Sequence, residues 1–167
     1  MKLPAGDVEI DASPTTRDGL KTQLLQLGRR SFNGYVSWLA RGHDGLEEGV
    51  VLYQEGKIVA ASYEHLKYGT VIDGEKALEP MANVAAGEGL VYSVVGLTLP
   101  KINLVLAFNE AAKLPKPIDP KNVADLFPKE YDNSIVLGIV HGLSQREQDR
   151  IKILAKYGLV GLRVDEI

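Results

Sequence analysis

The sequence predicts an α+β fold, in which an antiparallel meander of four or five strands packs with helices and an α/β C-terminal extension follows. Segments rich in β-branched and aromatic residues follow one another closely in the middle of the chain. Glu55-Gly56 joins two of these segments as a two-residue hairpin turn. Apolar residues at helical spacing flank the strand-rich region on both sides.

The N-terminal part predicts a short edge strand at residues 8–10 and a helix over residues 15–27. Leu20, Leu24 and Leu27 are spaced as one helical stripe, and Gly28 is suited to end the helix. The central part predicts strands at residues 34–40, 49–54 and 57–63, with a polar turn at residues 41–45.

Further along, a helix is expected from Asp73 to Val84, with Pro80 awkwardly inside it, and then a strand at residues 90–95. Thr98 and Pro100 begin another helix, which runs to Ala112. Because residues 102–108 are almost wholly apolar, this helix should be central to the core or to an interface.

The clearest predicted boundary is residues 114–122, where three prolines in nine residues should exclude regular structure. The predicted organisation is therefore a domain at residues 1–113, a linker at 114–122 and an extension at 123–167. The extension should hold a short helix at residues 122–127, an apolar run at 134–140 and a helix that begins at the capping box 144–147.

Composition limits the possible functions. The 167 residues include no cysteine, which excludes disulfides, thiolate metal sites and cysteine nucleophiles and fits a cytoplasmic protein. The first residues do not resemble a signal peptide, and the apolar runs are too short to span a bilayer. We therefore expect a cytoplasmic protein without membrane insertion.

Charge argues against nucleic acid as the main ligand. The net charge is −3, with nine basic and thirteen acidic residues before Pro100 and ten basic and nine acidic residues after it. Neither half has the concentrated positive charge that phosphate binding uses. Weak nucleic-acid binding remains a third hypothesis, because Arg146, Arg150, Lys152 and Lys156 share one predicted helix.

The candidates for chemistry are few. His43 lies in the predicted turn near Glu47-Glu48, His65 follows a strand and is expected to be exposed, and His141 follows the apolar run. Phosphate-binding glycine loops and a nucleophile elbow are missing from the sequence. The sequence predicts no catalytic, cofactor-binding or metal-binding residues, and an enzyme or small-ligand receptor that uses His141 or His43 is the alternative.

Aromatic residues suggest contact surfaces instead. Tyr35, Trp38 and Tyr63 lie on predicted strands, and Phe108 lies on the apolar helix. Tyrosine and tryptophan are enriched in binding hot spots, although core packing is the more common role of such residues. These four residues are the candidate interface, and an open sheet edge is a second possible contact surface.

A family resemblance supports this interpretation. The ordered blocks 34–36, 48–61 and 74–78 and Gly89 resemble the PATAN-type module, in which a helix precedes a "G-h-h" strand, a hairpin and a "G-x-x-A-L" helix. The sequence is most similar to an uncharacterised archaeal branch of it, over roughly residues 15–112. The resemblance implies a regulatory or adaptor module without assigned catalytic residues. Residues 62–72 and the C-terminal third depart from the pattern.

The favoured hypothesis is therefore a non-catalytic protein-interaction or adaptor module, and no cofactor is expected. Its protein partner is not identified by the sequence, and a homodimer formed through the apolar helix or a sheet edge is one possibility.

Overall fold

A computed structural model describes residues 1–142 of the chain and confirms the α+β class. The strands are β1 (Asp7–Pro14), β2 (Gly34–Gly42), β3 (Gly45–Gln54), β4 (Lys57–His65), β5 (Thr70–Asp73), β6 (Glu88–Gly96) and β7 (Lys113–Ile118). The helices are α1 (Arg17–Arg29), η1 (Gly74–Ala77), α2 (Leu78–Val84), α3 (Leu99–Phe108), η2 (Glu110–Ala112) and α4 (Pro120–Ala124).

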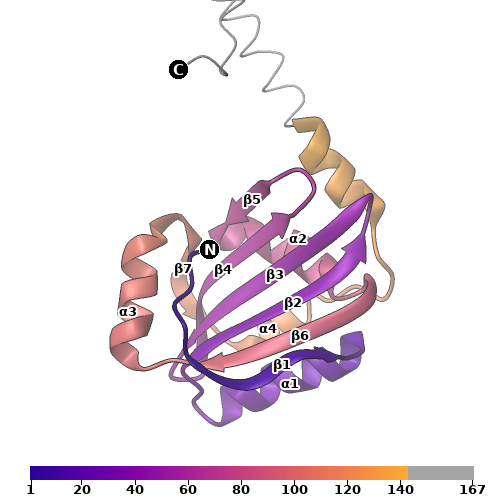
Figure 1. The fold of residues 1–167 in the computed structure, drawn as a ribbon. Coiled ribbons are helices and arrows are strands. Elements are labelled where there is room, and N and C mark those ends of the chain that lie inside the picture. The colour runs from indigo at the N-terminus through magenta and orange to yellow at the C-terminus, as the bar shows by residue number, and fades with distance from the viewer. Residues whose placement is uncertain (143–167) are drawn as a thin grey trace, which may run out of the picture. The chain divides into compact units, whose positions relative to one another are not determined.

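The described residues form one seven-stranded sheet in which every pair is antiparallel (Figure 1). Its order is β1-β6-β2-β3-β4-β5, and β7 pairs with β4 outside this path. The predicted consecutive strands 34–40, 49–54 and 57–63 correspond to β2, β3 and β4, but the sheet is not a simple meander, because β6 returns to pair with β2 and β1. The predicted number of four or five strands is too low, because β5 and β7 were missed.

Two tight turns set the register of the meander. Glu55 and Gly56 both have positive φ, at 51° and 77°, which is the backbone of a two-residue hairpin turn. His43 and Asp44 join β2 to β3, and the flanking Gly42 and Gly45 are paired. The strands therefore extend further into the predicted polar turn than its composition indicated.

The larger core lies between the sheet and helices α1, α2 and α4 (Figure 1). Leu20, Leu24 and Leu27 form the predicted buried stripe of α1. Trp38 lies against Gly49 of the neighbouring strand, where an added Cβ would come within 2.6 Å of the indole ring. Glycine at position 49 therefore makes room for the only tryptophan of the chain.

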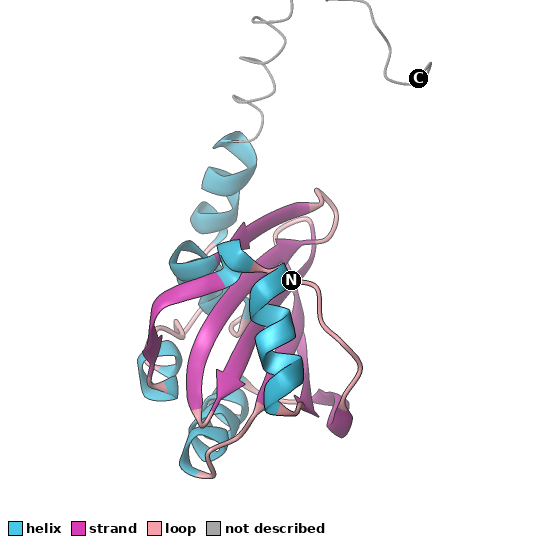
Figure 2. Cartoon of the chain, turned by 90° about the vertical axis from the view of Figure 1, so that its left-hand side faces the viewer, coloured by secondary structure: helices cyan, strands magenta, loops and turns pink. Residues whose placement is uncertain are grey.

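A smaller apolar cluster lies beneath α3, which stands apart from the other helices in Figure 2, where it faces the viewer. Ile102 and Val105 of α3 pack there with Leu52 and Ala60 of the sheet. The N-terminal segment also contributes to this cluster through Leu3.

Proline had different consequences from those predicted. In α2, Pro80 lies in the first turn, where its missing N–H breaks no helical hydrogen bond, because the α-helix begins only at Leu78. The prediction that prolines exclude regular structure from residues 114–122 is wrong, since β7 and α4 lie there. Strand β7 tolerates Pro115 and Pro117 because it pairs on one side alone, with β4.

The chain divides into two compact units, Met1–Asp132 and Asn133–Ile167. The first unit therefore continues past the proline-rich segment. In the second unit, residues 133–142 are helical, so the apolar run at residues 134–140 is part of a helix. The helix predicted from residue 144 lies outside the described residues. Among residues 1–142, none of the helices combines the length and hydropathy needed to cross a bilayer.

Candidate interaction surface

The four aromatic residues predicted as an interface lie in different environments. Trp38 and Tyr63 are fully buried, because both lie on the sheet face that the helices cover. The Trp38 Nε1–H donates to the Met81 carbonyl at 2.9 Å. Neither residue presents a contact surface in this structure. Tyr35 is half-buried beside the smaller apolar cluster, and Phe108 is exposed.

Helix α3 has an apolar outer side. Ile102 and Val105 face the cluster and are buried, whereas Leu99, Leu104 and Phe108 are 42%, 51% and 71% exposed. At 3.6 residues per turn, Leu104 and Phe108 share one flank of the helix beside the buried positions, whereas Leu99 lies on the opposite flank. A helix that is apolar all round is normally buried on all sides, so this outer side is an unusual surface for a chain in water.

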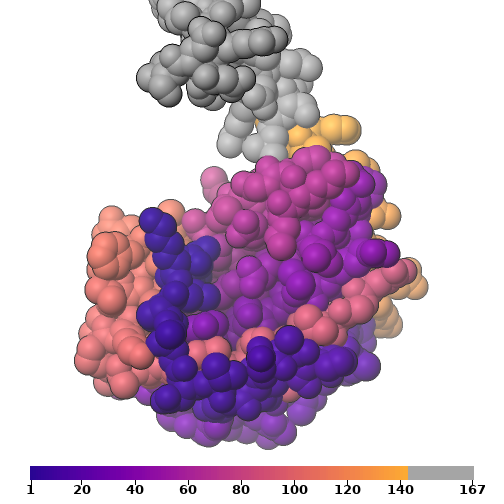
Figure 3. Space-filling view, viewed as in Figure 1, coloured from indigo at the N-terminus to yellow at the C-terminus, as the bar shows by residue number. Residues whose placement is uncertain are grey.

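A groove lies between α3 and the N-terminal segment, whose contact with α3 is visible in Figure 3. Its volume is about 190 Å³, and most of its lining is apolar. The lining residues are Lys2, Leu3, Pro4, Leu104, Val105 and Phe108.

Hydrogen bonds hold the two walls of the groove together. The Lys2 backbone N–H donates to Asn109 Oδ1 at 2.7 Å, and Asn109 Nδ2 donates back to the Lys2 carbonyl at 3.0 Å. Lys101 Nζ donates to the Ala5 carbonyl at 2.8 Å. The groove is therefore formed in advance of any binding, which lowers the entropy cost of association.

The charges around α3 are arranged against its dipole. A helix favours acids near its N-terminus and bases near its C-terminus. The first turn of α3 has no acidic residue and contains Lys101, while its last turn has no basic residue and Glu110 follows it. The Thr98 side chain makes no capping hydrogen bond.

The sheet edges are less suited to binding a further strand. Edge strand β1 has two register irregularities against β6 and a positive φ of 38° at Ala12. It also exposes Asp7, Glu9 and Asp11, and charges and bulges on an edge oppose pairing with another chain. At the other end of the path, β5 has only four residues.

A group of polar residues is buried at the end of the sheet where β2 turns into β3. The Glu47 side chain is fully buried and accepts three hydrogen bonds. The Tyr63 hydroxyl donates to Oε2 at 2.9 Å, the His43 backbone N–H donates to Oε1 at 3.2 Å, and the Tyr131 hydroxyl also donates to Oε1.

His65 lies directly opposite Glu47 on the neighbouring strand and is also fully buried. Its Nε2 lies 3.0 Å from the His43 carbonyl, which makes Nε2 the protonated nitrogen. Within the part of the chain that the structure describes, its Nδ1 and the nearby Thr70 Oγ1 have no hydrogen-bond partner. Tyr68 packs on the imidazole, with ring centroids 4.7 Å apart.

We define the Glu47 cluster as Glu47, Tyr63, Tyr131 and His65, of which all but the half-buried Tyr131 are fully buried. Burial, followed by the neighbouring Glu47 carboxyl, raises the pKa of both tyrosines well above the ordinary value of 10. The two hydroxyls therefore remain donors at neutral pH. In the described part of the chain, no group of three His, Asp or Glu side chains could hold a metal ion. The arrangement stabilises a buried carboxyl group rather than a substrate.

In the first unit, His65 contacts the backbone carbonyl of His43 rather than its ring. His43 is half-buried in the β2–β3 turn, and its backbone rather than its ring joins the Glu47 cluster. The expectation that His65 is exposed is wrong, because the β2–β3 turn and Tyr68 cover it. His141 is exposed in the helix at residues 133–142.

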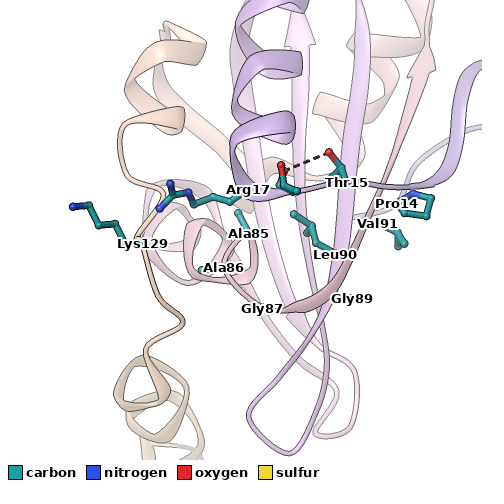
Figure 4. A pocket seen from close by; sticks show the side chains of 11 residues that line it. Pro14, Thr15, Arg17, Ala85, Ala86, Gly87, Gly89, Leu90, Val91 and Lys129 are labelled. Carbon is teal, nitrogen blue, oxygen red and sulfur yellow. Dashed lines mark hydrogen bonds between the residues drawn. The ribbon is translucent and has the colours of Figure 1, made fainter.

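A cleft of about 460 Å³ lies beside the start of α1 (Figure 4). Arg17 and Lys129 supply its cationic side chains. Arg17 is already bound to Asp18 at 2.8 Å and to the Pro128 carbonyl at 3.1 Å. Because Thr16 also caps the first turn of α1, little of the positive potential at this helix end is available to an anion. The basic residues Arg146, Arg150, Lys152 and Lys156 lie outside the described residues.

The sequence profile of a family described as "Uncharacterized protein conserved in archaea (DUF2226)" matches residues 1–109. This is more than half of the chain. The chain belongs to the DUF2226 family. The matched range runs from β1 to the end of α3 and includes Phe108 and Asn109, so the groove lies wholly within it. Membership is in accord with the predicted archaeal branch, whereas the PATAN-type resemblance stays a prediction.

A curated relative of this DUF2226 protein is an "Uncharacterized protein" from Archaeoglobus fulgidus. The two are 29% identical over 160 residues, which cover 95% of this chain and 57% of the relative. The chain thus spans little more than half the length of the relative that it matches. No solved structure matches the chain.

Sequence reasoning missed the Glu47 cluster of this DUF2226 protein. Glu47-Glu48 was noted only as a pair of acids, in which adjacent strand residues face opposite ways. That alternation does place Glu47 on the helix-covered face and Glu48 on the other face. The predicted strands 49–54 and 57–63 stop short of Glu47 and His65, and only the longer observed strands put these two residues on one face with Tyr63. No sequence signal indicates that Tyr131 donates its hydroxyl to Glu47.

Proposed function

We propose that this DUF2226 protein is a non-catalytic protein-interaction or adaptor module that contacts its partner through the outer side of α3. The observation that carries the proposal is the exposure of Leu104 and Phe108 on a helix whose side chains are nearly all apolar. Buried aromatic and aliphatic anchors supply most of the binding energy of protein interfaces.

Two further features support the proposal. The groove beside Phe108 is held in place by hydrogen bonds between the side chains of Asn109 and Lys101 and the backbone of the N-terminal segment, so it can receive an apolar side chain without rearrangement. Burying the exposed side of α3 would also remove apolar surface from water, at roughly 25 cal/mol per Å². The described histidines and carboxylates offer no comparable open site for chemistry.

A photo-crosslinking amino acid placed at position 108 tests the proposal. The protein is purified from cells of an archaeon that contains it, after irradiation, and adducts are identified by mass spectrometry. Position 126 is the matched control, because Leu126 is 48% exposed and lies away from α3. We expect a defined protein adduct from position 108 and none from position 126. Equal labelling at both positions, or none at either, would contradict the proposal.

A further inference from the structure

We infer that the partner of the α3 surface is a second copy of this chain, bound with the two α3 helices antiparallel about a two-fold axis. This inference rests on the proposed function and names the occupant of its surface. Three observations favour a copy over a foreign protein: the shape of the surface, the charges at its ends and its small size.

The shape is self-complementary. A two-fold interface uses the same patch on both subunits, so the patch must contain both a projection and a recess. Phe108 is the most exposed large apolar side chain of the described residues, and the groove beside it is bordered by Leu3, Pro4 and Leu104. In an antiparallel pair, Phe108 of each copy lies over the groove of the other.

The charges favour the antiparallel direction. An axis beside residues 105 and 106 places Lys101 of one copy level with Glu110 of the other, because both residues are equally far from it along the chain. Glu110 then lies near the N-terminus of the opposite α3, and Lys101 lies near its C-terminus. Each charge that opposes its own helix dipole is thereby placed where it stabilises the dipole of the other copy. Among residues 1–142, the ion pair of Glu110 is a 3.6 Å contact with Lys113.

The size of the surface sets the expected affinity. Helix α3 has ten residues and is therefore about 15 Å long. An interface centred on such a helix belongs to the smallest class of specific interfaces, which bury about 1,200 Å² or less. We expect a reversible dimer with a Kd on the order of 10–1,000 μM.

Charge exchange tests the inference. Sedimentation equilibrium is measured at up to about 1 mM protein for the wild type, for Lys101→Glu, for Glu110→Lys and for an equal mixture of the two variants. Alone, each variant places like charges together twice in its dimer, and its Kd should rise about three- to tenfold. In the mixture, both contacts between unlike variants are attractive, so the mixture should dimerise more tightly than either variant alone; Lys101→Glu also loses its bond to the Ala5 carbonyl, so recovery should stop short of the wild-type level.

A second measurement covers the case in which a variant folds poorly. Because the chain has no cysteine, Ala107→Cys introduces a single thiol on the outer side of α3. Oxidation should give a disulfide dimer with Ala107→Cys and little with Leu126→Cys. Circular dichroism confirms that each variant is folded before its association is compared.

The outcomes separate this inference from the proposed function. A wild-type monomer at 1 mM, or a mixture that associates no better than its components, overturns the second copy as partner. If position 108 then crosslinks to a different protein, the interaction module stands with another occupant. If position 108 gives no adduct at all, both ideas fail.

Discussion

Two regions of this protein reverse the usual distribution of residues. The outer side of α3 exposes Leu104 and Phe108, while the Glu47 cluster buries a carboxylate and an imidazole completely. Surplus apolar surface lies outside and ionisable groups lie inside. Each reversal is expensive unless something compensates for it.

The two regions differ in where the groups that offset this cost are found. Glu47 receives three hydrogen bonds from within its own compact unit, so its buried carboxyl group is compensated there. The outer side of α3 is not covered by any described residue of the first unit. Substitutions in the cluster should therefore change stability, and substitutions on the outer side of α3 should change association.

The largest effect is expected from Glu47→Ala, which leaves two tyrosine hydroxyls and a backbone N–H without their shared acceptor. We expect a loss of about 3 kcal/mol in the free energy of unfolding. Glu47→Gln retains an acceptor of the same shape and should lose about half as much. Urea unfolding of the dilute protein measures both. An Ala variant as stable as the wild type would show that the cluster is not a stabilising unit.

Within α3, inner and outer positions should behave differently. Val105→Ala removes buried methyl groups and should lower the free energy of unfolding by about 2 kcal/mol. Phe108→Ala should change the free energy of unfolding by less than about 0.5 kcal/mol, because this side chain is largely in water. Thermal melts at low micromolar concentration make the comparison. If Phe108→Ala proves as costly as Val105→Ala, the outer side is already covered within one chain.

Tyr131→Phe sharpens the account of the cluster by removing one hydroxyl. The hydroxyl donates to Glu47 and accepts from the His43 backbone N–H at 2.9 Å. Loss of this hydroxyl should lower the free energy of unfolding by about 1.5 kcal/mol. Tyr68→Phe is the control, since the Tyr68 hydroxyl binds Asp44 at the exposed surface. Its removal should lower the free energy of unfolding by less than about 0.5 kcal/mol, as is typical of surface sites.

The smallest effect concerns Glu48, on the opposite face of the sheet from Glu47. Partial burial, and then the nearby Glu64 carboxyl, raise the pKa of Glu48 above its ordinary value of 4.5. The folded protein therefore holds this proton more tightly than the unfolded chain does. As the pH rises from about 4.5 through the raised pKa, this contribution to stability is lost.

Glu48→Gln should consequently stabilise the protein at pH 7 by about 0.5 kcal/mol, a small gain because part of the side chain touches solvent. The gain should disappear below pH 4, where the wild-type carboxyl is protonated. Unfolding at both pH values measures it, with Glu88→Gln at the exposed start of β6 as the control. Equal stability of Glu48→Gln and the wild type at pH 7 would contradict the expected repulsion.

Local signals predicted much of the fold. The Glu55-Gly56 turn fixed the β3–β4 hairpin, because few residue pairs accept two successive positive φ angles. The spacing of Leu20, Leu24 and Leu27 predicted the buried stripe of α1. Both features depend on residues that are close together in the chain.

Long-range features could not be obtained in this way. The pairing of β6 with β2 and β1 is decided by packing, and nothing in the β6 sequence specifies its neighbour. The apolar residues of α3 predicted a core or interface helix, and only the structure separates its buried side from its exposed side. His65 is buried because of a turn and an aromatic ring that local polarity does not reveal.

The end of the first unit is fastened to its interior. Asn83, itself buried, exchanges two hydrogen bonds with the backbone of Asp132, at 2.9 and 2.8 Å. Tyr131 reaches a carboxylate 84 positions earlier in the chain. A polypeptide cut at residue 109, where the family match stops, would lack β7, α4 and this hydroxyl. The smallest autonomously folding piece should therefore be defined by the tether at residues 131 and 132.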